Sequence, residues 1–276
     1  MPDRSIKVRA RGVAKEFPAR AGDTEGYVAV RDFDLDVRDG EFLVVVGPSG
    51  CGKSTVLNLL GGLDRPTGGE LLLDGRPIDG PGLDRGIVFQ QYALFPWRTA
   101  LENVEFGLQS KGVARKDRRR IARDYLGLVG LTRFAGNYPH TLSGGMKQRV
   151  AIARALAYDP DVLLMDEPFA ALDAQTRESL QAQLVRIWQE TRKTVIFITH
   201  SIEEAVYLGE RVAVMTAGPG RIKQIVDIDL GGAERVNEGD IRSSYEFTRL
   251  RHELWTLLKA EVDKTAVEPE PVGVGR

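Results

Sequence analysis

The chain lacks the features that mark secreted and membrane-spanning proteins. It contains one cysteine, Cys51, so no disulfide can form within it. Its longest apolar runs, at 42–46, 162–165 and 195–198, are far shorter than the ~18–20 residues of a membrane-spanning helix. The first residues also lack the apolar core of a signal peptide. We therefore expect a cytosolic protein that does not itself cross a membrane.

Net charge is almost absent as well. The sequence has 38 Lys and Arg residues against 39 Asp and Glu residues, a formal net charge of −1. This balance provides no overall positive field for nucleic acid or an anionic membrane surface, so we expect no nucleic-acid partner. The basic cluster at 115–123 is expected to be a solvated helix face. A length of 276 residues fits one large domain, or one domain with a subdomain.

Strand and helix patterns alternate along much of the chain. The three apolar runs are bounded by turn or charged residues, which is typical of strands buried on both faces of a mostly parallel sheet. Between the last two runs, the segment 176–190 has one apolar helical stripe, formed by Leu180, Leu184, Ile187 and Trp188. The pattern predicts an α/β fold.

Two segments depart from this pattern. Near the N-terminus the chain alternates as a half-buried strand does, which predicts an antiparallel β piece before the core. The alternating apolar residues are Val28, Val30, Phe33, Leu35 and Val37. From about 98 to 142 the sequence is rich in helical patterns and poor in strand patterns, which predicts a helical insertion.

The C-terminal part predicts a loop, a helix and a tail. Residues 229–242 have a loop composition, and Ser243 with Glu246 fits the capping box of a helix start. An amphipathic helix follows, with its apolar stripe at Phe247, Leu250, Leu254 and Leu257. We expect residues 265–276 to be disordered.

A phosphate-binding pattern follows the run 42–46. Residues 47–54 fit GxxxxGK[ST], and strand, glycine loop and helix in this order are the context that such a loop requires. Backbone N–H groups of the loop can face the β- and γ-phosphates, while Lys53 supplies positive charge and the Ser54 hydroxyl a Mg²⁺ ligand. The expected nucleotide contacts are Gly47, Pro48, Ser49, Gly50, Cys51, Gly52, Lys53, Ser54 and Thr55.

Cys51 can be interpreted in two ways. The start of the following helix can lower the pKa of its thiol and make it reactive. Alternatively, this point of the loop simply needs a small residue, which is the interpretation we expect to hold. A reactive thiol predicts that a bulky alkylating agent blocks nucleotide binding and that ATP protects against it.

Two acidic residues end the apolar run that begins at Val162. Asp166 and Glu167 follow a predicted strand, and the carboxyl ends of strands are where open α/β sheets place their ligand chemistry. Asp166 is positioned to hold Mg²⁺ through water, and Glu167 can polarise an attacking water as general base. With the phosphate loop, this strand end predicts a site for nucleotide hydrolysis.

A third motif adds a family resemblance. Residues 142–149, with the sequence LSGGMKQR, resemble the signature motif of ATP-binding cassette (ABC) proteins and precede the acidic strand by the expected short distance. With the other two motifs, the resemblance extends from about residue 7 to 225. It implies the P-loop NTPase fold of an ABC nucleotide-binding domain over 1–228, with a helical subdomain at about 98–157 and a C-terminal linker and helix at 229–264.

The resemblance also implies roles for single residues. Phe17 corresponds to the aromatic residue that stacks on adenine, although Tyr27 is close in sequence and Phe17 also fits a core position. Gln90, next to Gln91, corresponds to the glutamine that senses Mg²⁺ and the γ-phosphate, and His200 to the switch histidine that contacts the γ-phosphate. The implied sites are catalytic Glu167 and His200, the Mg²⁺ ligands Ser54, Gln90 and Asp166, and the ATP contacts Ser143, Gly144 and Gly145 of the signature and Asp173 of the D-loop (172–173).

A second copy of the chain and a transport system are the implied partners. In this family the signature of one copy faces the phosphate loop of another, so two ATP molecules are sandwiched in a dimer, here a homodimer. In similar importers the membrane permease docks beside the loop after Gln90, which here contains Phe95, Pro96 and Trp97. Local packing under the helical subdomain is the alternative. An extracytoplasmic solute-binding protein would act indirectly, with this chain peripheral on the cytoplasmic side of the cell (inner) membrane.

Several motifs resemble the nitrate, sulfonate and taurine branch of importers. Met146, where Gln is commonest, also resembles that branch, and the Ser143 hydroxyl and backbone N–H groups can still meet a phosphate there. The implied function is ATP-driven uptake of a small, anionic solute. The alternatives are an exporter or lipid-transport ATPase and a non-transport ABC ATPase.

Overall fold

A six-stranded, mostly parallel sheet forms the centre of the protein. The computed structural model describes residues 4–19, 26–230 and 241–267. The strand order is β10-β9-β3-β8-β7-β6, and β10 alone pairs antiparallel, with β9. The bounds are β3 (Phe42–Val46), β6 (Arg85–Val88), β7 (Val162–Asp166), β8 (Thr194–Thr199), β9 (Arg211–Met215) and β10 (Ile222–Asp227). The three predicted strands β3, β7 and β8 are therefore confirmed, as neighbours in this sheet.

A second, antiparallel sheet comes from the N-terminal part of the chain. Its order is β2-β1-β4-β5, with bounds β1 (Ile6–Phe17), β2 (Tyr27–Arg38), β4 (Gly68–Leu73) and β5 (Arg76–Pro77). Of the residues predicted to be buried on β2, Val30, Phe33, Leu35 and Val37 are buried, because successive side chains of a strand point to opposite faces. Val28 is only partly buried, and its neighbour Ala29 is buried instead. The antiparallel β piece is confirmed.

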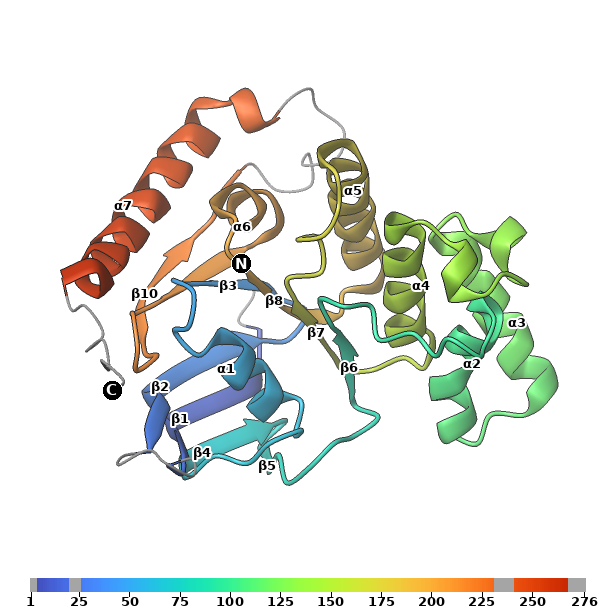
Figure 1. Ribbon diagram of the computed structural model, residues 1–276, viewed down its shortest axis with the longest axis horizontal. Coiled ribbons are helices and arrows are strands. Elements are labelled where there is room, and N and C mark those ends of the chain that lie inside the picture. The colour runs from blue at the N-terminus through green and yellow to red at the C-terminus, as the bar shows by residue number, and fades with distance from the viewer. Residues whose placement is uncertain (1–3, 20–25, 231–240, 268–276) are drawn as a thin grey trace, which may run out of the picture.

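Helices cover the large sheet and form a separate group beside it (Figure 1). The helix α1 (Lys53–Leu60) contacts β7 and β8 of the large sheet and β2 of the small one. The sheet's other face packs against α5 (Ala174–Thr191) and α6 (Ile202–Leu208). The separate group consists of α2 (Ala100–Ser110), α3 (Arg115–Leu128), η1 (Thr132–Phe134), η2 (Pro139–Thr141) and α4 (Gly144–Ala157).

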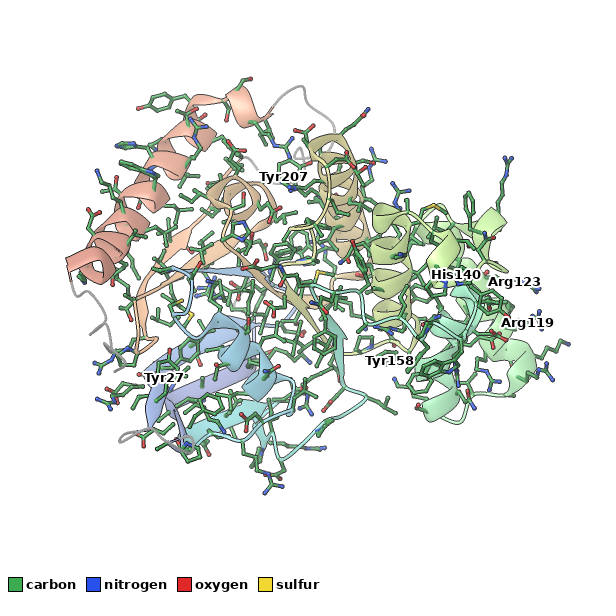
Figure 2. The ribbon with its side chains drawn as sticks, in the orientation of Figure 1. Tyr27, Arg119, Arg123, His140, Tyr158 and Tyr207 are labelled. Carbon is green, nitrogen blue, oxygen red and sulfur yellow. The ribbon has the colours of Figure 1, made fainter. Side chains whose placement is uncertain are left out.

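The basic cluster at 115–123 lies on α3. All of its Lys and Arg side chains except Arg118 are exposed, and Arg118 pairs with Glu105 at 3.7 Å. Figure 2 shows Arg119 and Arg123 on the outer side of the helical group. The cluster is therefore the solvated helix face that the sequence predicts.

The C-terminal helix α7 (Tyr245–Val267) lies along α6 and β9 at the edge of the molecule (Figure 1). The predicted stripe is confirmed, since Phe247, Leu250 and Leu254 are buried. None of the described helices is long and apolar enough to span a bilayer.

The start and the end of α7 differ from the prediction. Ser244, not Ser243, caps the helix: its hydroxyl accepts the Phe247 N–H at 3.1 Å, while Ser243 ends the short helix η4 (Ile241–Ser243). The predicted loop 229–242 lies largely outside the described residues. The helix continues to Val267, so the predicted tail does not begin at 265, and residues 268–276 lie outside the described part.

Successive side chains of β3 point into two separate hydrophobic cores, one on each face of the large sheet. Phe42, Val44 and Val46 face the helices α2 to α7, while Leu43 and Val45 face α1 and the small sheet. All five residues are buried, which explains why this strand reads as a continuous apolar run. Because β3 is anchored in both cores and ends directly before the phosphate loop, it holds the start of that loop in place.

Candidate active site

The phosphate loop turns from β3 into α1 through left-handed glycines. Gly50 has φ 76° and Gly52 has φ 95°, where other residues are strained. A Cβ on Gly52 would lie 2.7 Å from the carbonyl oxygen of Ala29, so only glycine fits there. No side chain caps α1. Its first N–H groups therefore provide the anion-binding end of a helix.

Lys53 and Tyr27 hold the loop from two sides. The buried Lys53 Nζ donates to the carbonyl oxygens of Gly47 and Pro48, both at 2.8 Å. The Tyr27 hydroxyl donates to the Gly50 carbonyl at 3.1 Å. The ammonium group thus lies within the curve of the loop, where a phosphate would meet it.

Cys51 is packed inside the loop. Its side chain is 1% exposed, and its sulfur would lie 2.7 Å from a Cβ placed on Gly47. Burial raises the pKa of the thiol, against the opposing effect of the Lys53 charge. The structure therefore supports a small packing residue and not an activated thiol.

Asp166 lies beside Ser54 at the end of β7. Burial raises the pKa of Asp166, and the Ser54 hydroxyl opposes this by hydrogen bonding to the carboxylate. The charge of Glu167 raises that pKa further, while the Lys53 charge lowers it. A hydroxyl and a carboxylate oxygen side by side are the hard donors that Mg²⁺ prefers, so these residues fit the expected ion.

Glu167 turns away from Asp166 and meets His200. Its backbone has φ 41°, and its N–H donates to the Ile198 carbonyl of β8 at 2.9 Å. Its Oε2 lies 3.0 Å from Nδ1 of His200, at the end of the neighbouring strand β8. Because β3, β8 and β7 are adjacent and parallel, their carboxyl ends bring the loop, both carboxylates and the imidazole to one edge.

Phe17 and Gln90 lie at the sides of this edge. Phe17 is 37% exposed, so the core alternative is wrong, and it pairs across the strands with Tyr27, which bonds the phosphate loop. The Lys15 ammonium lies 5.0 Å from its ring centroid. Gln90 follows β6, the edge strand next to β7, and its side chain is exposed, as is that of Gln91.

The signature residues and Asp173 begin two other helices. The Ser143 hydroxyl accepts the Met146 N–H at 3.3 Å and caps α4. Asp173 accepts the Thr176 N–H at 2.9 Å and caps α5. A Cβ on Gly145 would lie 2.6 Å from the Thr176 side chain, so glycine lets these two helix starts approach.

The structure does not bring the signature and the phosphate loop of one chain together. The signature begins α4, which lies in the helical group away from α1, the helix that follows the phosphate loop (Figure 1). A site that uses both motifs is incomplete in one chain.

The loop after Gln90 is partly packed and partly exposed. Trp97 is 71% exposed, with its ring centroid 5.7 Å from that of Phe95, which in turn lies 4.6 Å from Phe106. The buried Asn103 fixes the loop, since its amide donates to the carbonyls of Phe95, Arg98 and Thr99. Local packing thus accounts for Phe95 but not for Trp97.

Sequence reasoning missed two residues beneath the site. Glu204 is buried on α6, four residues after His200, and Arg177 on α5 donates to the carbonyl of Leu172. Charged residues are seldom buried without a partner. An acidic residue on the inner face of a helix, such as Glu204, was therefore the sequence signal that could have indicated a buried polar cluster.

Comparison with known proteins places these motifs in a family context. The family model described as ABC transporter matches residues 30–170. The chain is 53% identical over 260 residues to an uncharacterised ABC transporter ATP-binding protein of Methanocaldococcus jannaschii, covering 94% of each chain. It is 47% identical to the nitrate import ATP-binding protein NrtD of Synechocystis sp., over 88% of this chain and 93% of that protein. It is 49% identical to the taurine import ATP-binding protein TauB of Rhizobium johnstonii, over 90% and 94%.

Solved structures agree with this result. A dimeric ATP-binding cassette in a post-hydrolysis state, bound to ADP and Pi, is 38% identical with a TM-score of 0.70, covering 80% of this chain and 99% of that one. A second dimeric structure of such a cassette has a TM-score of 0.72 at the same identity and coverage.

Proposed function

Because the chain belongs to the ABC transporter family, we propose that it is the ATP-hydrolysing subunit of a solute importer. The observation that carries this proposal is the pairing of Glu167 with His200 at 3.0 Å, at the sheet edge that holds the phosphate loop. The names of the nitrate and taurine import relatives support uptake of a small, anionic solute. The chain acts at the cytoplasmic side of the cell membrane, without spanning it.

The proposed reaction is attack of water on the γ-phosphorus of ATP, which breaks the bond to the β–γ bridging oxygen and releases ADP and inorganic phosphate. Glu167 polarises the water as general base. When ATP binds, the Lys53 ammonium gives up its hydrogen bonds to the two loop carbonyls and donates to phosphate oxygens instead. His200 is exposed, and because its Nδ1 faces Glu167, Nε2 is the ring nitrogen that contacts the γ-phosphate. Phe17 stacks on adenine, an arrangement supported by its exposed ring next to Tyr27.

Ser54, Gln90 and Asp166 are the proposed Mg²⁺ ligands. The effect of the Ser54 hydroxyl in lowering the pKa of Asp166 supports two of the three, because it requires the hydroxyl to lie near that carboxylate. Bound there, the ion would neutralise charge that develops on the transferred phosphate.

The test of the proposed chemistry is Glu167→Gln. This variant keeps the shape of the side chain and loses the base, so ATP binding persists while turnover falls by about two or more orders of magnitude. ATP-loaded dimers then accumulate, because hydrolysis is what reopens them. The exposed Glu190→Gln serves as control, with unchanged turnover. Near-normal hydrolysis by Glu167→Gln would remove Glu167 from the base role.

The partners are tested with the same variant. ATP-loaded Glu167→Gln protein is recovered from detergent-solubilised native membranes, and the chains that copurify are identified. Recovery of a multi-helix permease with a solute-binding protein supports import, and the binding protein can then be used to identify the solute. A permease without a binding protein favours an exporter or lipid-transport system. Ribosomal or DNA-bound partners would overturn the transport function and keep the ATPase.

Trp97 is the proposed centre of the permease contact. It is the most exposed aromatic residue of its loop, and Phe106, whose ring contacts that of Phe95, is also exposed. We expect Trp97→Glu to abolish recovery of the permease and to leave ATP binding intact. Trp255→Glu is the matched control, because Trp255 is an exposed tryptophan on α7, at the other side of the molecule (Figure 1). Equal recovery with both variants contradicts docking at Trp97.

A further inference from the structure

A buried carboxylate lies directly beneath the loop that carries His200. Glu204 on α6 is 7% exposed, and its Oε2 accepts the Thr199 hydroxyl at 2.5 Å. The same hydroxyl oxygen accepts the Ser201 N–H at 3.0 Å. Through Thr199, Glu204 therefore holds the backbone on both sides of the exposed His200.

The other oxygen of Glu204 faces the loop that begins α5. Its Oε1 accepts the Gln181 amide at 3.2 Å and lies 4.0 Å from Nε of Arg177. Arg177 in turn donates to the carbonyl of Leu172 at 2.8 Å, next to Asp173. One carboxylate thus connects the His200 loop with the D-loop.

The C-terminal segment closes this cluster from outside. Arg242 of η4 donates to Oε1 of Gln181 at 2.7 Å, pairs with Glu178 at 3.4 Å, and lies 4.5 Å from the ring centroid of Tyr207. Figure 2 labels Tyr207 between the ribbons of α6 and α5. Gln181 is fixed from both ends, so it presents its amide to Glu204 in one orientation.

Polar and charged groups surround Glu204, and they offset in part the effect of its burial. Burial raises the pKa of Glu204, and the Thr199 hydroxyl, the Arg177 and His200 charges and the Gln181 amide all oppose that effect. A group with both oxygens engaged cannot move without leaving buried partners unsatisfied. The cluster is therefore stiff, although it lies between two loops.

We propose that Glu204 is a positioning residue for ATP hydrolysis, which holds His200 against Glu167 through Thr199 and couples that loop to the D-loop through Arg177. The proposal rests on the role of His200 proposed above. Glu204 itself is remote from the reacting atoms, because the Thr199 hydroxyl lies between it and the loop.

The first experiment compares two adjacent acidic residues. Glu204→Gln keeps the size of the side chain but replaces one of its two acceptor oxygens with an amide N–H₂ donor. The Thr199 hydroxyl and the Gln181 amide can then no longer both donate to it. We expect kcat to fall by about tenfold to a hundredfold, with KM for ATP within about twofold, since a misplaced group costs rate more than binding. Glu203→Gln is the control, because Glu203 is 63% exposed on the same helix and pairs only with Arg251 at 3.4 Å in the described part of the chain. Equal kcat in both variants overturns the proposal.

A double variant separates positioning from general damage. If Glu204 acts through His200, adding Glu204→Gln to His200→Ala lowers kcat no further. If it merely supports the fold, the two losses multiply, and the proposal is wrong. Near-normal turnover of His200→Ala alone would instead refute the proposed role of His200 and leave the Glu204 contacts as structure.

Thr199 provides a test that leaves the charge in place, should Glu204→Gln fold poorly. Thr199→Ser retains the hydroxyl and is expected to keep kcat near that of the parent, whereas Thr199→Val removes the link and lowers kcat as Glu204→Gln does. Equal kcat in the serine and valine variants contradicts the proposal.

Discussion

Asp166 and Glu167 are neighbours in sequence but have different surroundings. Asp166 ends strand β7 beside the Ser54 hydroxyl, and burial raises its pKa. Glu167 adopts φ 41°, and this left-handed turn directs its carboxylate to the imidazole of His200. A change of backbone conformation over one residue thus separates the proposed ion-binding position from the proposed base position.

Cys51 should be inert in the folded protein. It is buried and its thiol pKa is raised, so little thiolate is present at pH 7 and reagents cannot reach it. We expect a bulky maleimide to modify folded protein at least roughly a hundredfold more slowly than urea-unfolded protein, as measured by intact mass. Rapid modification of folded protein that ATP suppresses would restore the reactive interpretation.

At the scale of elements, α7 is attached to the hairpin β9–β10 by one buried carboxylate. Glu261 is 1% exposed; its Oε1 lies 2.7 Å from Lys223 and 2.8 Å from Lys264, and its Oε2 accepts the Ala217 N–H at 3.1 Å. The same hairpin loop contains Gly220, whose N–H donates to the Ala29 carbonyl at 2.9 Å. The end of α7 is therefore hydrogen-bonded to the same hairpin loop that contacts β2 next to the phosphate loop.

This attachment should depend on pH. Burial alone would raise the pKa of Glu261, but Lys223, Lys264 and the Ala217 N–H together lower it to about 2. A lowered pKa means that the stabilisation is fully present above the unfolded value of 4.5 and is lost as pH falls toward 2. We expect Glu261→Gln to reduce the free energy of unfolding by about 3 kcal/mol at pH 7.

Urea unfolding at pH 7, 4 and 3 checks this prediction. The difference between Glu261→Gln and the parent should shrink across that range. Glu253→Gln is the control on the same helix, because Glu253 forms a surface pair with Arg249 at 3.4 Å and should change stability by less than about 0.5 kcal/mol. A difference that stays constant from pH 7 to 3 would show that Glu261 contributes shape and not charge.

Elements with strong local patterns were predictable, whereas their pairing was not. The apolar run Phe42–Val46 has the composition of a doubly buried strand, but its position between β8 and β9 depends on contacts far apart in sequence. Likewise Ser243 and Ser244 are chemically alike, and only the packed helix selects the second as cap. Glu204 was missed because local pattern assigns a charged residue to the surface, while its partners come from other elements.

At the scale of the whole molecule, the two motifs that the proposed ATP site requires lie in different parts of one chain. The phosphate loop lies between the two sheets, and the signature begins α4 in the helical group. The dimeric cassettes with 38% identity support completion of each site by a second copy. The motifs suggested the site residues, and the family resemblance implied their division between two copies. The structure adds that the phosphate loop and the signature lie on separate elements of one chain.

Mixing two inactive variants tests this division. Lys53→Ala damages the phosphate loop, while Ser143→Asp keeps the cap of α4 and repels the phosphates of the partner's ATP. In a mixed dimer both defects fall on one site and the other is intact, so we expect about a quarter of parental turnover at equal mixing. Each variant alone should be nearly inactive. No recovery on mixing, with dimers present by sedimentation, contradicts sites shared between copies.

The single, buried cysteine has a practical consequence for spectroscopy. Any cysteine introduced on the surface becomes the sole accessible thiol, so the native background needs no engineering. A substitution such as Ser110→Cys, at the exposed end of α2, would carry one spin label or fluorophore per copy. In a dimer the two labels define a single distance. The change of this distance during the nucleotide cycle measures how far the two helical groups move relative to each other.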